Sequence, residues 1–205
     1  ASYGFTDYYF VFAIAIAFLL AFAVGYFVEF IMIRHLYKRP LDTLLATWGL
    51  SLVMQQIFRS SFGAKEVSAE LPEWMLGSFK PTPDIDIPIN GVFVMVLAAL
   101  VTFGVYMFMY KSRWGLRVRA TVQNRTMAGA VGINTAKVDR VTFALGGGIA
   151  GIAGAAFTTI ASTGPTTGTL YIVDSFMVVV FGGAASIVGT IASAFGIAQA
   201  QSILQ

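Results

Sequence analysis

Long apolar runs alternate with short polar segments along this chain. The runs Tyr8–Ile33, Gly91–Tyr110 and Val141–Ile160 each reach the roughly 20 residues that a helix needs to cross a hydrocarbon core of about 30 Å. The run Leu41–Phe58 is shorter and carries more polar side chains. The pattern predicts four membrane-crossing helices before Ser162.

The chain becomes irregular after Ser162. The segment Thr163–Leu170 contains a proline and two turn-forming glycines, and two apolar pieces follow it, Tyr171–Phe181 and Ile187–Leu204. The first piece is too short for an ordinary span, which is typical of broken or re-entrant helices that line an enclosed cavity. We therefore predict one all-α domain over residues 1–205, a polytopic transmembrane helical bundle with about five to six membrane segments.

The composition supports a membrane protein. Apolar residues make up 57% of the chain and charged residues 11%, whereas soluble domains carry about 25% charged residues. The absence of cysteine from the sequence excludes disulfides and thiolate metal sites. Because residue 1 is alanine and the chain ends inside an apolar stretch, we expect a fragment with both ends of the full-length protein missing.

The basic residues predict the orientation. They concentrate in Arg34–Pro40 and in Lys111–Arg140, which holds seven Lys/Arg against one Asp, whereas the intervening loop 59–90 is net acidic. Cytoplasmic loops of membrane proteins are enriched in Lys and Arg. We therefore expect residues 34–40 and 111–140 in the cytoplasm, and residues 1–7 and 59–90 outside it.

Two carboxylates lie in or beside the apolar runs. A charge at the bilayer centre costs about 2.5–3.5 kcal/mol on insertion scales, so each needs an explanation. Glu29 lies close to Arg34, and an interfacial pair of these two side chains is the simpler interpretation. Asp174 either lines an external mouth or lies at the membrane interface.

The run Leu41–Phe58 carries a polar stripe. Thr47, Ser51 and Gln55 recur at every fourth position and therefore share one helix face. Hydrogen bonding to a neighbouring helix is one explanation. A path for a small polar solute is the other, and we take these three residues and Asp174 as candidate pathway residues.

The sequence argues against an enzyme and against a metal site. No glycine is followed by lysine, so the phosphate-binding loop of ATPases is absent. Asp84 and Asp86 lie in a proline-bounded loop, where carboxylates are ordinarily solvated, and the single histidine, His35, lies in a basic loop. An aspartyl mechanism would need a second carboxylate beside Asp174. We expect no metal and no cofactor on this chain.

The basic segment Lys111–Arg140 has internal structure. Trp114-Gly115 separates it from the preceding span, Leu116–Ala130 is compatible with one helix, and Gly132 suits the C′ position that ends a helix. Asn134 or Thr135 can cap the next helix.

The centre of this segment is small and apolar. TMAGAVGIN, residues 126–134, is unusual for a loop bathed in water. An apolar patch with basic rims suits the docking of a partner protein. An amphipathic helix resting on lipid headgroups is the alternative.

Three segments resemble a known family. Trp114–Ala155, Leu41–Gln56 and Val178–Gly183 are similar, in the same order, to permeases of bacterial ABC importers of the branched-chain amino acid type. Within that family, Thr163–Gly183 resembles the urea-transporting branch most. One departure follows Gly182-Gly183, in the short bend between the last two apolar pieces. Relatives usually carry a further Gly and a Ser or Asn there, whereas this chain has Ala184–Ser186, and this change affects the expected flexibility of the bend.

The resemblance implies a permease subunit in the bacterial inner membrane, acting by alternating access. Its implied partners are a second permease, cytoplasmic ATPase subunits that bind the ATP, and an extracytoplasmic solute-binding protein. Residues 124–134 would be the cytoplasmic coupling helix that docks on the ATPase, with Arg125, Met127, Gly129 and Gly132 as contact and shape residues.

We expect urea as the substrate, because a neutral amide needs hydrogen bonds and no countercharge. The alternatives are an amino-acid importer of the same family, and a stand-alone channel or secondary transporter.

Overall fold

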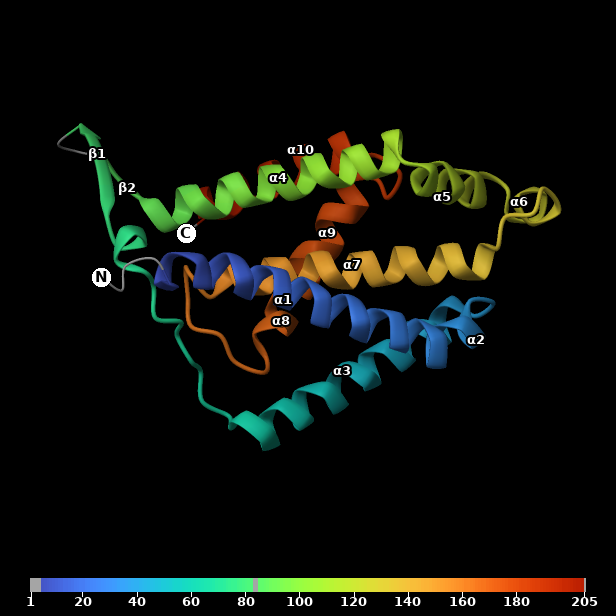
Figure 1. Ribbon diagram of the computed structural model, residues 1–205, viewed down its shortest axis with the longest axis horizontal. Coiled ribbons are helices and arrows are strands. Elements are labelled where there is room, and N and C mark those ends of the chain that lie inside the picture. The colour runs from blue at the N-terminus through green and yellow to red at the C-terminus, as the bar shows by residue number, and fades with distance from the viewer. Residues whose placement is uncertain (1–4, 83–84, 205) are drawn as a thin grey trace. The chain divides into compact units, whose positions relative to one another are not determined.

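The computed structural model describes residues 5–82 and 85–204, most of which are helical (Figure 1). The chain divides into two compact units. The first comprises Ala1–Met54 and Glu66–Thr163, and the second comprises Gln55–Lys65 and Gly164–Gln205. The sequence-based expectation of one domain over residues 1–205 stays a prediction.

The first predicted span is a helix that continues past its expected end. Helix α1, Phe5–Val28, passes into a π-helical turn at Glu29–Ile33 and then into the short α2, Arg34–Leu36. Helix α3 runs over Pro40–Phe62 and is longer at its C-terminal end than the predicted run Leu41–Phe58. Pro40 suits the first turn of α3, because backbone N–H groups in a first turn have no intrahelical acceptor and proline loses nothing by lacking an N–H.

An ordered connection joins α3 to the next long helix. It contains a 3₁₀ turn, Glu73–Met75, and two antiparallel strands, β1 (Ser78–Thr82) and β2 (Ile85–Pro88). The pairs Ser78↔Pro88 and Phe79↔Ile87 set the register. The sequence predicted a solvated loop here, so the hairpin is a new finding.

Contacts within the first unit hold this connection in place. Met75 is 2% exposed. The Trp74 ring meets the Phe93 ring edge-on with the ring centroids 6.1 Å apart, within the range of about 4.5–7 Å that is typical of aromatic pairs. A bridge joins Val67 to Thr163. The connection is thereby tied to the segment that follows α7.

Four helices complete the first unit after the hairpin. They are α4 (Ile89–Lys111), α5 (Arg113–Gln123), α6 (Arg125–Ala130) and α7 (Thr135–Phe157). Helix α7 begins at Thr135, six residues before the apolar run predicted from Val141, so Asp139 and Arg140 belong to this helix.

Helices α1 and α7 lie side by side (Figure 1) because small residues let their backbones approach. A Cβ on Gly151 would lie 2.6 Å from the carbonyl oxygen of Ala17, and a Cβ on Gly147 would lie 3.0 Å from that of Ala21. Each of these distances is at or below the closest approach that Cβ atoms normally make. Within the stretch Gly146–Ala156, Gly147 and Gly151 are thus the glycines that allow α7 to pack against the α1 backbone.

The second unit contains the predicted broken helices. Helices α8 (Thr167–Leu170), α9 (Ile172–Gly182) and α10 (Ile187–Leu204) follow one another with a sharp bend after α9. Gly183 has φ +80° at this bend, a conformation that favours glycine. Ser186, within the stretch that departs from the related permeases, accepts a hydrogen bond from the Gly189 N–H at 3.0 Å and so caps α10.

The distribution of exposed side chains is that of a membrane protein. Large apolar residues cover the outside of the long helices, whereas Gly25 and the carboxylate of Glu29 are buried. In the described residues, four helices are long and apolar enough to cross a membrane, at 8–36, 89–111, 135–157 and 187–204. The predicted helical membrane bundle is confirmed, and membrane crossing by α3 and α9 stays a prediction.

We predict that Gly151→Leu disrupts the α1–α7 contact. The added side chain would overlap the α1 backbone, and overpacking of this kind costs about 1–3 kcal/mol. The thermal unfolding midpoint of the purified protein in detergent should fall by several degrees. The matched control is Gly154→Leu on the same helix, since a Cβ at Gly154 meets nothing within 4 Å. Equal midpoints for the two variants would contradict the proposed close packing.

Candidate functional site

The basic segment begins with a capped turn. The Ser112 hydroxyl accepts a hydrogen bond from the Trp114 N–H at 3.0 Å and caps α5. The chain therefore breaks at Ser112, and the predicted break at Trp114-Gly115 is wrong. Gly115 instead lies within α5, where it is buried against the end of α4. Only glycine fits there, because a Cβ would overlap the backbone carbonyls of Phe108 and Met109.

The next break divides the segment into two helices. Asn124 has an extended backbone, with φ −153° and ψ 99°, and its side chain accepts a hydrogen bond from the Met127 N–H at 3.0 Å. The predicted single helix over Leu116–Ala130 is therefore wrong, because Asn124 acts as the N-cap of α6 and not as an interior residue.

The end of α6 is as predicted. Gly132 has φ +88°, and the Ile133 N–H bonds the Ala128 carbonyl at 3.0 Å. The Asn134 side chain accepts a hydrogen bond from the Lys137 N–H at 3.0 Å and caps α7. Both cap predictions are confirmed.

A small apolar surface lies on α6 and the turn after it. Ala128 is 3% exposed and holds the helix against the unit, whereas Met127 is 60% and Val131 74% exposed. A Cβ on Gly129 or Gly132 meets nothing within 4 Å, so the space above both glycines is open. We call Met127, Gly129, Val131 and Gly132 the α6 patch. Its residues lie together, as a docking surface requires.

Arg125, the first residue of α6, is held by its own chain. Its guanidinium forms an ion pair with Asp139 on α7 and lies 5.6 Å from the centre of the Tyr37 ring. The Arg125 side chain is 53% exposed. Contact between Arg125 and an acidic partner therefore stays a prediction, because Asp139 already balances the charge.

A buried ion pair joins α1 to α7. Arg140 Nε lies 3.0 Å from Glu29 Oε2, and the Glu29 side chain is fully buried. The predicted partner, Arg34, is exposed, so the proposed Glu29–Arg34 pair is wrong. A buried carboxylate needs a charge or several hydrogen bonds close by, and close packing of α1 on α7 brings Arg140 to it.

Aromatic side chains surround this pair. The Arg140 guanidinium lies 5.3 Å from the centre of the Tyr26 ring and 4.6 Å from that of Phe30, and it donates a hydrogen bond to the Tyr26 hydroxyl at 3.4 Å. These contacts stabilise the charged Arg140 guanidinium, which has little access to solvent. No local pattern in the sequence indicates this cluster, since Glu29 and Arg140 are 111 positions apart.

Tyr37 connects the buried pair to the surface. Its hydroxyl donates a hydrogen bond to Glu29 Oε1 at 3.3 Å. Partial burial, and then the nearby Glu29 carboxylate, raise the pKa of Tyr37 above its usual value. The phenol therefore stays neutral and keeps the proton that it donates.

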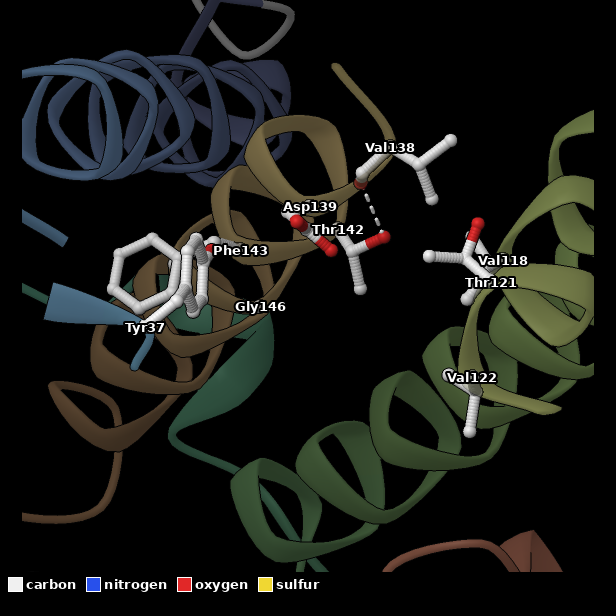
Figure 2. Close-up of a pocket in the computed structure, with 10 residues that line it drawn as sticks. Tyr37, Val118, Thr121, Val122, Val138, Asp139, Thr142, Phe143 and Gly146 are labelled. Atoms are coloured by element: carbon white, nitrogen blue, oxygen red, sulfur yellow. Dashed lines mark hydrogen bonds between the residues drawn. The ribbon is translucent and has the colours of Figure 1, made fainter. Parts of the chain in front are cut away.

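A pocket of about 480 Å³ lies beside these residues (Figure 2). Helices α5 and α7 line it together with Tyr37, and its walls are mostly apolar. Thr121 and Thr142 each bond a carbonyl of their own helix at 2.8 Å. The pocket thus has mostly apolar walls, and Asp139 on α7 is the one carboxylate among the residues that line it.

The predicted polar stripe on α3 is half-buried. Thr47, Ser51 and Gln55 share this intermediate exposure, whereas the apolar Trp48 and Leu52 are exposed. The Thr47 hydroxyl bonds a carbonyl of its own helix at 2.9 Å. Within the second unit, Gln55 Nε2 donates to the Thr169 hydroxyl at 3.1 Å. Interhelical hydrogen bonding thus occurs at Gln55, and a role in a solute path stays a prediction.

Asp174 lies in the first turn of α9. Its Oδ1 accepts a hydrogen bond from Gln201 Nε2 on α10 at 3.0 Å. Thr47 and Ser51 belong to the first unit and Asp174 to the second, so the pathway prediction remains open. Among residues 5–82 and 85–204, no group of three or more His, Asp or Glu side chains is placed to hold a metal. Asp84, considered above as a metal ligand, lies outside the described residues.

The long apolar helices, the small-residue packing and the capped α5–α6 segment define a polytopic helical membrane protein. The whole chain, residues 1–205, matches the family described as the branched-chain amino acid transport system / permease component. The chain belongs to this family.

Several curated relatives carry the same description. The probable branched-chain amino acid transport permease protein LivH of Methanocaldococcus jannaschii is 30% identical over 86% of this chain and 53% of its own length. The high-affinity branched-chain amino acid transport system permease proteins BraD of Pseudomonas aeruginosa and LivH of Escherichia coli K12 are 28% and 27% identical over 90% and 91% of the chain, and 64% and 62% of their own lengths. The chain thus spans between about half and two thirds of these relatives. No solved structure matches it.

We predict that Asn124→Ala loosens α6. Loss of an N-cap side chain costs about 1 kcal/mol, so the amide protons of α6 should exchange with deuterium several-fold faster. Asn124→Asp keeps an acceptor oxygen at the cap and should exchange at nearly the wild-type rate. Hydrogen exchange with mass spectrometry on the purified protein measures both. An unchanged rate in Asn124→Ala would contradict the capping role.

Proposed function

We propose that the chain is the membrane core of the permease subunit of an ABC importer for branched-chain or other amino acids. The match of all 205 residues to the branched-chain amino acid permease family carries this proposal. The relatives named above carry the same substrate class in their descriptions. None of those descriptions mentions urea, so the urea importer expected from Thr163–Gly183 is the less supported of the two substrates.

The proposed docking surface for the ATPase is the α6 patch. A short capped helix that exposes small and apolar residues fits into a groove of a partner. Near the patch in the sequence, the exposed Lys137 supplies a basic rim, together with Arg125, which is 53% exposed although it is paired with Asp139. Because no glycine precedes a lysine in this sequence, ATP is bound by the partner subunits in this proposal.

The proposed topology follows the charge distribution. Residues 34–40 and 111–140 lie in the cytoplasm, where the ATPase docks, and residues 1–7 and 59–90 lie outside. An extracytoplasmic binding protein delivers the solute to that outer side, and a second permease subunit completes the path. Thr47, Ser51, Gln55 and Asp174 are the proposed pathway residues of this subunit.

Gly129→Trp should abolish association with the ATPase subunits. The indole fills the open space above Gly129 and blocks a close-fitting partner, whereas a Cβ at this position meets no other part of the described chain within 4 Å. Pull-down of the ATPase from detergent-solubilised membranes measures the loss.

The matched control is Leu116→Trp, at an apolar position on α5 that is 61% exposed. This variant should retain the ATPase and insert into the membrane at the wild-type level. Normal pull-down with Gly129→Trp would show that the α6 patch is not the docking surface. Gly132 is less suitable for the test, because its φ of +88° strains any side chain.

The full-length permease, reconstituted with its partner permease, ATPase and binding protein, should take up leucine only when ATP is hydrolysed. Parallel assays with radiolabelled leucine and urea identify the solute. Urea uptake without leucine uptake would overturn the amino-acid proposal and favour the urea branch. Solute flux that persists without the ATPase subunits would instead indicate a stand-alone channel or secondary transporter.

A further inference from the structure

We propose that Glu29, Tyr37, Arg125, Asp139 and Arg140 form a ring that transmits movement of α6 to the α1–α7 helix pair. Side-chain contacts join its members, and the peptide bond between Asp139 and Arg140 closes it. Tyr37 is the positioning residue on which this transmission depends. The inference rests on the proposed function, because it assumes that an ATPase moves α6.

Two consecutive residues of α7 face different elements. Asp139 forms an ion pair with Arg125 on α6, and Arg140 forms one with Glu29 at the end of α1. Neighbouring positions on a helix point in different directions, so this stretch of α7 is held from two sides at once. Movement of α6 therefore acts directly on the part of α7 that packs against α1.

Tyr37 closes the ring from the other side. Its hydroxyl bonds Glu29 at 3.3 Å while its ring lies 5.6 Å from the Arg125 guanidinium. Tyr37 directly follows α2 in the chain. Its side chain contacts both Arg125 of α6 and the buried Glu29 carboxylate. The four charged members comprise two cations and two anions, and the ring is electrically balanced.

The exposure of the members increases from the inside outward. Among the charged side chains, exposure is 0% at Glu29, 15% at Arg140, 16% at Asp139 and 53% at Arg125. Pairs at the surface are easily solvated and exchanged, whereas separation of a buried pair is strongly opposed. Displacement of Arg125 can therefore change the outer contacts while the inner pair keeps α1 and α7 together.

The innermost member of the ring, Glu29, lies in an irregular turn of helix. Glu29 is the first residue of the π-helical turn Glu29–Ile33, where the hydrogen-bond pattern of α1 changes. Such turns are frequent at functional sites. A change of contact at Glu29 thus acts where α1 is least regular.

The test compares two tyrosines that contact the same cluster. Tyr37→Leu removes the ring and hydroxyl that connect Glu29 to Arg125, and Tyr26→Leu removes a ring and hydroxyl that contact Arg140 alone among the charged members. Tyr37 is 41% exposed, whereas Tyr26 is less accessible, so a purely structural role would make Tyr26→Leu at least as harmful. Each variant is reconstituted in the complete transporter, and leucine uptake per ATP hydrolysed is measured.

We expect Tyr37→Leu to lower uptake per ATP hydrolysed at least fivefold, with ATPase association unchanged, and Tyr26→Leu to leave this ratio within twofold of the wild type. Equal ratios in Tyr37→Leu and wild type would overturn the ring proposal alone, as would equal losses in both variants. A wild-type complex without ATP-dependent uptake of leucine or urea would instead overturn the proposed importer function.

Discussion

The close approach of α1 and α7 is the contact on which the first unit depends. Two glycines of α7 lie so near the α1 carbonyls that no side chain fits between the backbones. In a membrane, where helices gain little from burying apolar surface, such packing is a main source of association. The same approach brings Arg140 to Glu29 and allows a carboxylate to be fully buried. Glycine packing and charge burial therefore support each other at this interface.

The buried pair also restricts how α1 and α7 can be aligned. Small residues alone would permit a sliding interface, because neighbouring alignments of glycine and alanine differ little in packing energy. A displacement along the helix axis would separate Glu29 from Arg140, which is costly for a carboxylate without water. Together with the aromatic rings around Arg140, the ion pair selects one alignment. Specificity of alignment is the best-supported role of buried polar groups in helix pairs.

Local signals in the sequence predicted much of the fold. Apolar run length located the long helices, Gly132 and Asn134 marked their caps, and glycines marked the bend before α10. The division at Asn124 was missed, because asparagine is compatible with both a helix interior and an N-cap, and tertiary contacts decide between them. The α6 patch was predicted from its small apolar composition. The partner of Glu29 could not be, because it depends on the alignment of two helices 111 residues apart.

The two caps that isolate α6 have a consequence for the evolution of such permeases. With an extended residue at Asn124 and a left-handed glycine at Gly132, the short helix is a self-contained insert between two independently terminated helices. Its exposed residues can change with few effects on the membrane-embedded helices, apart from the attachment through Arg125. In the proposed importer, residues that contact the ATPase can then change without altering the residues that contact the solute. The ATPase subunit and the transported solute would therefore be free to diverge separately.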